Sequence, residues 1–170
     1  MKSIYIFFIL IIILSSCSSS NITYDYDHNA IFSNYKTYSW LNHSEFNPSD
    51  MLLKNENLEI KIKRAVNKIL KNKNLTFQEN GKPDFVIFIH TGKQSKDGLY
   101  KFYPWWQPCG YTSVSTFEEN SLVIDIIGKN NSLIWRGLAP GFFKSYKKTQ
   151  YLQKELDNVV TSILDGFPPN

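Results

Sequence analysis

The most reactive side chains in this chain of 170 residues are its two cysteines, Cys17 and Cys109. Cys17 lies in the sequence ILSSCSSS, directly after an unbroken apolar run of eleven residues at positions 4–14. A thiol in such a place is a buried side chain, half of a disulfide, or a site of covalent modification. Two cysteines are too few for a disulfide scaffold, so the residues around Cys17 must indicate its chemistry.

The segment before Cys17 has the features of an export signal. A membrane-spanning helix needs roughly 20 apolar residues, whereas the run of eleven fits the apolar part of a secretory signal that begins with Lys2. The sequence Leu14-Ser15-Ser16-Cys17 resembles the bacterial lipobox, in which small side chains admit the peptide to the processing enzymes and the thiol forms a thioether. This resemblance to lipoprotein precursors implies cleavage before Cys17 and acyl chains on it. Two or more such chains anchor a protein stably.

This interpretation divides the chain into three parts. They are a lipoprotein signal peptide at 1–16, a short lipidated linker at 17–21, and a single α+β domain at 22–170. In the sorting rule known for enteric bacteria, a serine after the cysteine favours the outer membrane, and Ser18 occupies that position. We therefore expect the membrane to be a partner through acylated Cys17, with the domain facing the periplasm.

The remaining sequence offers little evidence for catalysis. The three histidines, His28, His43 and His90, do not show the close spacing of metal ligands. The chain lacks a Gly-rich phosphate loop after a strand and a Gly-x-Ser-x-Gly motif. Cys109 and His90 could form a nucleophilic pair in principle, but a semi-buried loop cysteine fits the spacing better. The sequence predicts no catalytic residue, metal or cofactor, and a formal charge of +4 is too small to indicate nucleic-acid binding.

One irregular segment, residues 98–112, is unusually aromatic. Such rings can stack on sugars or anchor a protein partner, so another envelope protein or a glycan is the kind of partner we consider. The alternative is that the rings cover the sheet or the edge of the domain. The candidate contact residues are Tyr100, Tyr103, Trp105, Trp106 and Tyr111.

Hydropathy patterns predict the elements that position these residues. Alternation or continuous apolar character indicates strands, and apolar residues spaced by threes and fours on one face indicate two helices. The predicted fold class is α+β: a mostly antiparallel sheet with two amphipathic helices packed on one face. The expected strands are 22–27, 34–41, 84–90, 121–128 and 132–139, and the expected helices are 55–73 and 149–164.

A hairpin turning symmetrically about residues 130–131 would place Asp125 opposite Arg136. The same register would pair Ile127 with Ile134 and Lys129 with Ser132. Because an unpaired buried carboxylate is costly, we favour a structural ion pair between Asp125 and Arg136. An anion-binding arginine oriented by the aspartate is the alternative.

Three stretches, with PDFVIFIH between the first two, resemble one family in their order and spacing: YDYDHNAIFSNYKTYSWL, SLVIDIIGKNNSLIWRG and ILDGFPP. They look like the bacterial lipoprotein family called domain of unknown function 4136. The resemblance covers essentially the whole chain after Cys17 except residues 91–112, and it implies a lipobox but no activity. The matching residues are Asp27, Phe32, Tyr35, Tyr38, Trp40, Pro83, Asp84, Asp125, Trp135, Arg136, Gly137, Phe167, Pro168 and Pro169.

These observations predict a lipid-anchored cell-envelope protein that acts as a non-enzymatic binding or structural component. The alternative is an envelope hydrolase or glycan-binding protein that uses the aromatic segment 98–112. A glycosidase would need two carboxylates flanking a cleft, and the candidate acids are Asp84, Asp97, Glu118, Glu119 and Asp125.

Overall fold

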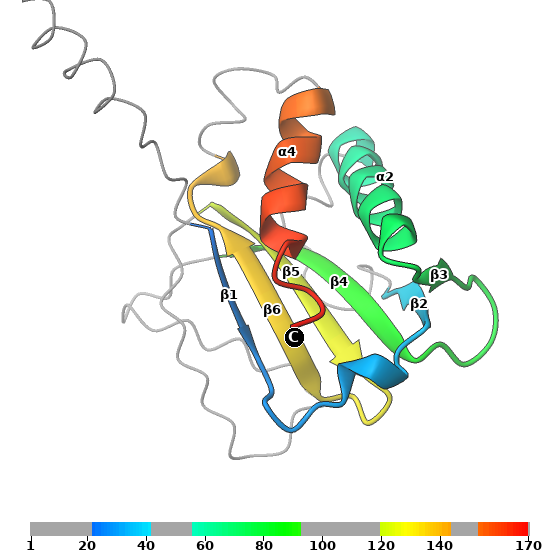
Figure 1. The fold of residues 1–170 in the computed structure, drawn as a ribbon. Helices are drawn as coiled ribbons and strands as arrows, with labels where there is room; N and C mark the ends of the chain where they lie inside the picture. Colours follow the sequence, from blue (N-terminus) through cyan, green and yellow to red (C-terminus); the bar gives the residue numbers. More distant parts are fainter. Residues whose placement is uncertain (1–21, 42–55, 93–119, 144–152, 170) are drawn as a thin grey trace, which may run out of the picture.

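The computed structural model describes residues 22–41, 56–92, 120–143 and 153–169 (Figure 1). These residues form one six-stranded sheet and two long helices. Within the described ranges, no helix combines the length and the hydropathy needed to cross a membrane. In chain order the elements are β1 (Thr23–Tyr26), the 3-10 turn η1 (Phe32–Asn34), β2 (Thr37–Trp40), α2 (Glu56–Asn72), β3 (Thr76–Phe77), β4 (Phe85–Gly92), β5 (Ser121–Gly128), β6 (Leu133–Ala139) and α4 (Gln153–Leu164).

The α+β class is confirmed, but the sheet is mixed. Its strand order is β1-β6-β5-β4-β2-β3. Strands β1, β6, β5 and β4 pair antiparallel, whereas β2 pairs parallel with both β3 and β4. The expected antiparallel pairing therefore holds from β1 to β4, and it is wrong for β2 and β3. Helix α2 lies in the chain between β2 and β4, and a crossover of this kind returns the chain in the same direction.

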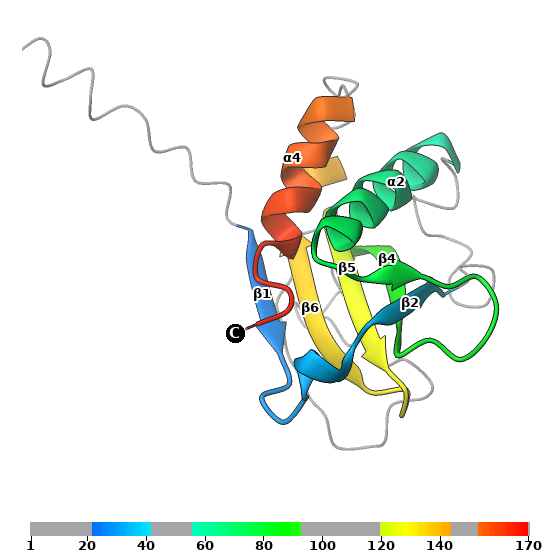
Figure 2. The same ribbon diagram turned by 45° about the vertical axis from the view of Figure 1, so that its right-hand side comes forward.

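Both helices lie on one face of the sheet, side by side, as Figures 1 and 2 show from two directions. The apolar positions of α2 are spaced by threes and fours, so they form one stripe along the helix. This stripe and the inner side of α4 enclose the main core against the sheet. The buried residues of the helices are Leu58, Ile62, Ala65, Val66, Leu70, Leu156, Val160, Ile163 and Leu164.

The C-terminal segment packs against the first strand and the aromatic core. A Cβ atom at Gly166 would lie 2.5 Å from the Tyr24 ring, so only a glycine lets that ring approach. At Gly137 a Cβ would lie 2.2 Å from the Trp135 ring, which occupies the space beside the strand. Phe167 then packs edge-on against Trp135. The glycines of the Trp-Arg-Gly and Asp-Gly-Phe-Pro-Pro sequences therefore have a packing role.

The β5–β6 hairpin matches the expected register in its middle and departs from it near the turn. Asp125 lies opposite Arg136, as expected, but Ile127 pairs with Leu133 because a bulge follows Ile126. Both the Ile127–Ile134 pair and the Lys129–Ser132 pair are therefore wrong. The Gly128 N–H donates to the Ser132 carbonyl instead. The extra residue, Ile134, joins the core on the helix side.

Candidate functional site

Several of the sequence-based predictions concern residues that the structure does not describe. Cys17 lies outside the described ranges, and so does the aromatic segment 98–112 with Tyr100, Tyr103, Trp105, Trp106 and Tyr111. The acids Asp97, Glu118 and Glu119 also fall outside these ranges. Besides ion pairs on the helices, the described residues contain one group of charged side chains in the middle of the sheet and one at its end.

The group in the middle of the sheet is built around Asp125 and Arg136. Asp125 accepts hydrogen bonds from Arg136 Nε and Nη2 at 2.6 Å each, one to each carboxylate oxygen. The two side chains are only 1% and 8% exposed. Neighbouring antiparallel strands place them on one face of the sheet, because directly opposite residues point the same way. This is a bidentate, buried ion pair, the strong geometry for arginine and carboxylate.

His90 is a third member of this group, although the sequence predicts it at the end of the expected strand 84–90. Its Nε2 atom lies 3.0 Å from Asp125 Oδ2, and its side chain is 6% exposed. Strand β4 continues to Gly92, so His90 is an internal strand residue. Phe88 lies directly opposite Asp125, which puts His90 two residues further along the same face. The period-two alternation of Val86, Phe88 and His90 is the signal that could have indicated this position.

The environment of Asp125 keeps the carboxylate charged. Burial by itself raises the pKa of this carboxyl group, but the charge and hydrogen bonds of Arg136, followed by those of His90, lower it well below its ordinary value. Burial by itself lowers the pKa of Arg136, but the charge and hydrogen bonds of Asp125, with a smaller contribution from Asp25 on β1, raise it above its ordinary value. Both oxygens of Asp125 thus bind cationic or hydrogen-bonding partners within the protein. The geometry favours a structural ion pair over an arginine that captures an external anion.

The second group lies at the end of the sheet, where Asp84 precedes β4. Its Oδ2 atom accepts hydrogen bonds from the backbone N–H groups of Lys36 and Thr37 at 2.9 and 2.8 Å, and from the Thr37 hydroxyl at 2.9 Å. Its Oδ1 atom lies 2.8 Å from Lys129 Nζ. The Lys129 ammonium group, and then the backbone donor of Lys36, hold the pKa of Asp84 well below its usual range. Asp84 therefore joins the start of β2, the start of β4 and the β5–β6 turn.

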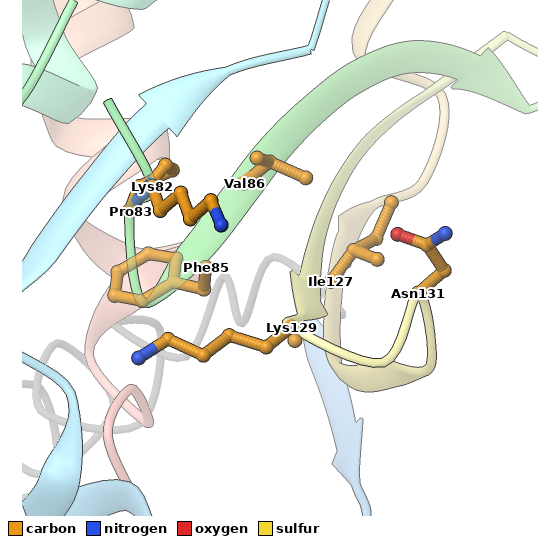
Figure 3. Close-up of a pocket in the computed structure, with 8 residues that line it drawn as sticks. Lys82, Pro83, Phe85, Val86, Ile127, Lys129 and Asn131 are labelled. Atoms are coloured by element: carbon orange, nitrogen blue, oxygen red, sulfur yellow. The ribbon is translucent and has the colours of Figure 1, made fainter. Parts of the chain in front are cut away.

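A pocket of about 370 Å³ opens beside this second group. The directly paired Val86 and Ile127 form an apolar part of its lining. Figure 3 shows the side chains of Lys82 and Lys129 on either side of Phe85. We call this cavity the hairpin pocket. Its lining residues are Lys82, Pro83, Phe85, Val86, Ile127, Gly128, Lys129 and Asn131.

A second cavity, of about 320 Å³, lies at the same end of the domain. We call it the tail pocket, because the C-terminal segment forms part of its wall. Half of the lining residues are aromatic or proline, and two lysines contribute the charge. The tail pocket is lined by Phe32, Ser33, Tyr35, Lys36, Lys73, Asn74, Leu75, Phe167, Pro168 and Pro169.

The two candidate acids that the structure describes do not act on a common site. Asp125 binds Arg136 and His90, whereas Asp84 binds Lys129 and the start of β2. The two groups share no partner among the hydrogen bonds and ion pairs of the described residues. In that part of the chain, no three side chains of the metal-binding types gather closely enough to hold an ion.

The fold and these two groups define a small α+β domain with a buried charge cluster in its sheet. The chain belongs to the family described as domain of unknown function (DUF4136), whose model matches residues 22–169. A search of curated proteins found no match.

Two solved structures are similar to the chain. The crystal structure of a PDZ domain protein from Parabacteroides distasonis ATCC 8503 matches 88% of this chain with a TM-score of 0.53 and 16% sequence identity. The matched region is 35% of that protein, so this chain spans about a third of its length, and the likeness shows the fold alone. The PelC dodecamer from Paraburkholderia phytofirmans matches 85% of this chain and 96% of its own, with 9% identity and a TM-score of 0.43. That score supports no inference.

Proposed function

We propose that this protein is a lipoprotein anchored in the bacterial outer membrane through acyl chains on Cys17, with its domain in the periplasm. The observation that carries this proposal is the sequence Leu14-Ser15-Ser16-Cys17 after an eleven-residue apolar run. Strand β1 begins at Thr23, only six positions after Cys17. A linker this short would hold the domain close to the membrane surface.

We further propose that the domain acts as a non-enzymatic binding or structural component of the envelope. The charged group in the centre of the sheet supports this role, because Asp125 binds both Arg136 and His90 in a buried cluster. The pockets at the end of the sheet also support it, since they offer apolar walls and lysines without a paired acid and base in their linings.

An envelope hydrolase or a glycan-binding protein is the second candidate function. The observation that favours it is the crowding of Tyr100, Tyr103, Trp105, Trp106 and Tyr111 into one segment. Incubation of the purified protein with peptidoglycan fragments, followed by mass spectrometry, would test it. Release of shortened fragments would favour the hydrolase over the non-enzymatic role.

Metabolic labelling with radioactive palmitate tests the anchor. We expect the wild-type protein to take up label and to float with the outer membrane in a density gradient. The Cys17→Ala variant should lose both properties, whereas Cys109→Ala, which removes the other thiol, should keep them. Labelling that persists in Cys17→Ala, or is lost in Cys109→Ala, would overturn the proposed attachment site.

A further inference from the structure

Both pockets lie at the end of the sheet opposite to the start of β1. The strand registers establish this, because Tyr26 at the end of β1 pairs with Trp135 and Phe85 at the start of β4 pairs with Gly128. Thr23, at the other end of β1, pairs with Leu138 near the end of β6. Figure 1 shows the β5–β6 turn and η1 together at this end. If the proposed anchor at Cys17 holds, the two pockets lie across the sheet from the point of attachment.

The hairpin pocket presents its two lysines differently. Asp84 holds the Lys129 ammonium group at 2.8 Å, and the donors from the start of β2 keep Asp84 itself in place. Lys129 is therefore positioned beside the pocket by residues that do not line it. Lys82 is exposed, and among the described residues it forms no ion pair. An anionic group entering the pocket would find one cation held in position and one able to adjust.

The tail pocket combines lysines with apolar and aromatic lining residues, which are more numerous than those of the hairpin pocket. Lys36 and Lys73 supply the charge, and neither forms an ion pair with another described residue. Lys73 follows the C-terminal end of α2, where a cation stabilises the helix dipole, so its charge has a structural explanation. Lys36, Lys82 and Lys129 lie in loops and turns, where no helix end explains them.

Tyr35 lies close to both cavities. It lines the tail pocket, and its hydroxyl oxygen would lie 3.7 Å from a Cβ atom at Gly128, which lines the hairpin pocket. Burial raises the pKa of Tyr35, followed in effect by Asp27, while Lys129 opposes the change. The hydroxyl therefore stays protonated at neutral pH and can donate a hydrogen bond. We call the two pockets, together with Tyr35, the distal surface.

The acids near the distal surface do not line it. Among the described residues, no aspartate or glutamate lines either pocket. Asp84 is neutralised by Lys129, and Asp27 accepts from the backbone and side-chain nitrogens of Asn29. Glu79 and Asp165 are exposed and line neither cavity. Among the described residues, the two linings therefore hold four lysines and no carboxylate.

We propose that the distal surface binds an acidic peptide segment of an envelope partner, with apolar side chains in the two pockets and carboxylates on the lysines. Separate pockets lined by Phe, Tyr, Pro, Val and Ile fit the side chains of an extended peptide, and rim lysines fit its acids. A sugar site would need more planar polar side chains, and the two linings hold only the amides Asn74 and Asn131. This inference deepens the binding role proposed above.

Fluorescence anisotropy of a labelled peptide tests the proposal with the purified lipoprotein in detergent micelles. The probe is a fluorescein-labelled peptide of repeated Glu-Leu-Glu units, compared with the same peptide carrying Gln in place of Glu. We expect the acidic peptide to bind and the Gln peptide to bind at least about tenfold more weakly, because the carboxylates face the rim lysines. Equal binding of the two peptides, or no binding of the acidic one, would overturn the proposal.

Charge-reversal variants locate the site. Lys36→Glu/Lys82→Glu changes one exposed lysine in each pocket and should weaken binding of the acidic peptide about tenfold or more. Arg64→Glu/Lys154→Glu changes the net charge equally on exposed helix positions away from the pockets, and it should leave the affinity within about twofold. Thermal unfolding would verify that both variants are folded, and Lys36→Gln/Lys82→Gln is the milder replacement if the first is not. Equal weakening by the two reversals would indicate nonspecific attraction and refute the site.

Two further probes separate the other possible occupants. A soluble polyuronate and vesicles containing phosphatidylglycerol carry the same kind of charge on a glycan and on a lipid surface. Binding of either one that exceeds peptide binding and depends on Lys36 and Lys82 would make it the occupant and remove the peptide proposal. None of these outcomes affects palmitate labelling at Cys17, so failure of this site and failure of the anchor can be distinguished.

Discussion

Asp125 and Asp84 are both carboxylates that bind a cation from another strand or turn, yet their surroundings differ. Asp125 is 1% exposed in the middle of the sheet, and both of its oxygens are bound by Arg136. Asp84 is 19% exposed at the end of the sheet, and its cation, Lys129, is 61% exposed beside a pocket. The comparison teaches that the same pair of charges can hold a core together or position a cation at a surface. The difference lies in how much water reaches the cation.

The largest expected effect on stability comes from neutralising Asp125, the buried carboxylate. Asp125→Asn would remove the buried carboxylate charge that binds Arg136 through both oxygens, and we expect the free energy of unfolding to fall by about 3–5 kcal/mol. Urea unfolding followed by tryptophan fluorescence measures this loss. Asp165→Asn, which neutralises an exposed carboxylate, should change it by less than about 0.5 kcal/mol.

A double variant makes this prediction more specific. Asp125→Leu/Arg136→Met removes both charges, and buried ion pairs replaced by apolar residues often retain their stability. We expect the double variant to be more stable than Asp125→Asn. A double variant at least as unstable as Asp125→Asn would show that the ion pair itself stabilises the fold. It would contradict the interpretation that Asp125→Asn is unstable because the buried charge of Arg136 is no longer neutralised by Asp125.

The Asp125–Arg136 pair shows what one sequence can predict. A hairpin turn between two apolar runs fixes the neighbouring residues of both strands, so local pattern was enough to place the pair. The bulge after Ile126 was not predictable in this way, because it depends on the geometry of the turn. Asn131 adopts a φ of 55° there, a left-handed conformation that asparagine tolerates better than most residues.

Local sequence patterns could not predict the contacts between segments that lie far apart in the chain. The parallel pairing of β2 with β4 depends on the path of α2, and the contact of His90 with Asp125 depends on β4 lying next to β5. The tail pocket is lined by three segments that are separated in the sequence, so no single sequence motif predicts the pocket. Helix positions, by contrast, depend on local spacing of apolar residues, and both described helices lie within the ranges that this spacing predicts.

Asp84 is the more exposed of the two carboxylates, so its neutralisation should cost less stability than that of Asp125. Asp84→Asn would weaken the charge-assisted hydrogen bonds to the start of β2 and the ion pair with Lys129. Such bonds contribute about 1.5–3 kcal/mol when well protected, and partial exposure lowers the expected loss to about 1–2 kcal/mol. Urea unfolding again measures it, with Glu79→Gln as the control because this exposed acid lies in the same turn. A loss as large as that of Asp125→Asn would contradict the distinction between the two sites.

The pH dependence of stability should reflect both carboxylates. Because folding lowers both pKa values, the unfolded state binds protons more readily than the folded state as the pH falls. The stabilisation is therefore complete above the unfolded pKa, near 4, and is lost below it. Each carboxylate should contribute about 1 kcal/mol of lost stability between pH 5 and pH 3. Thermal unfolding of Asp84→Asn across this range should show a shallower decline than the wild type, and an identical decline would refute the contribution of Asp84.

The smallest expected effect is at Lys129. Its ammonium group is 61% exposed, and exposed ion pairs typically contribute about 0–1 kcal/mol, so Lys129→Gln should lower the free energy of unfolding by less than about 0.5 kcal/mol. The same variant removes the positioned cation of the hairpin pocket and should weaken binding of the acidic peptide several-fold. Urea unfolding and anisotropy on one protein sample measure the two effects together. A large loss of stability without a loss of binding would place Lys129 in the class of Arg136, as a structural cation, and would remove it from the distal surface.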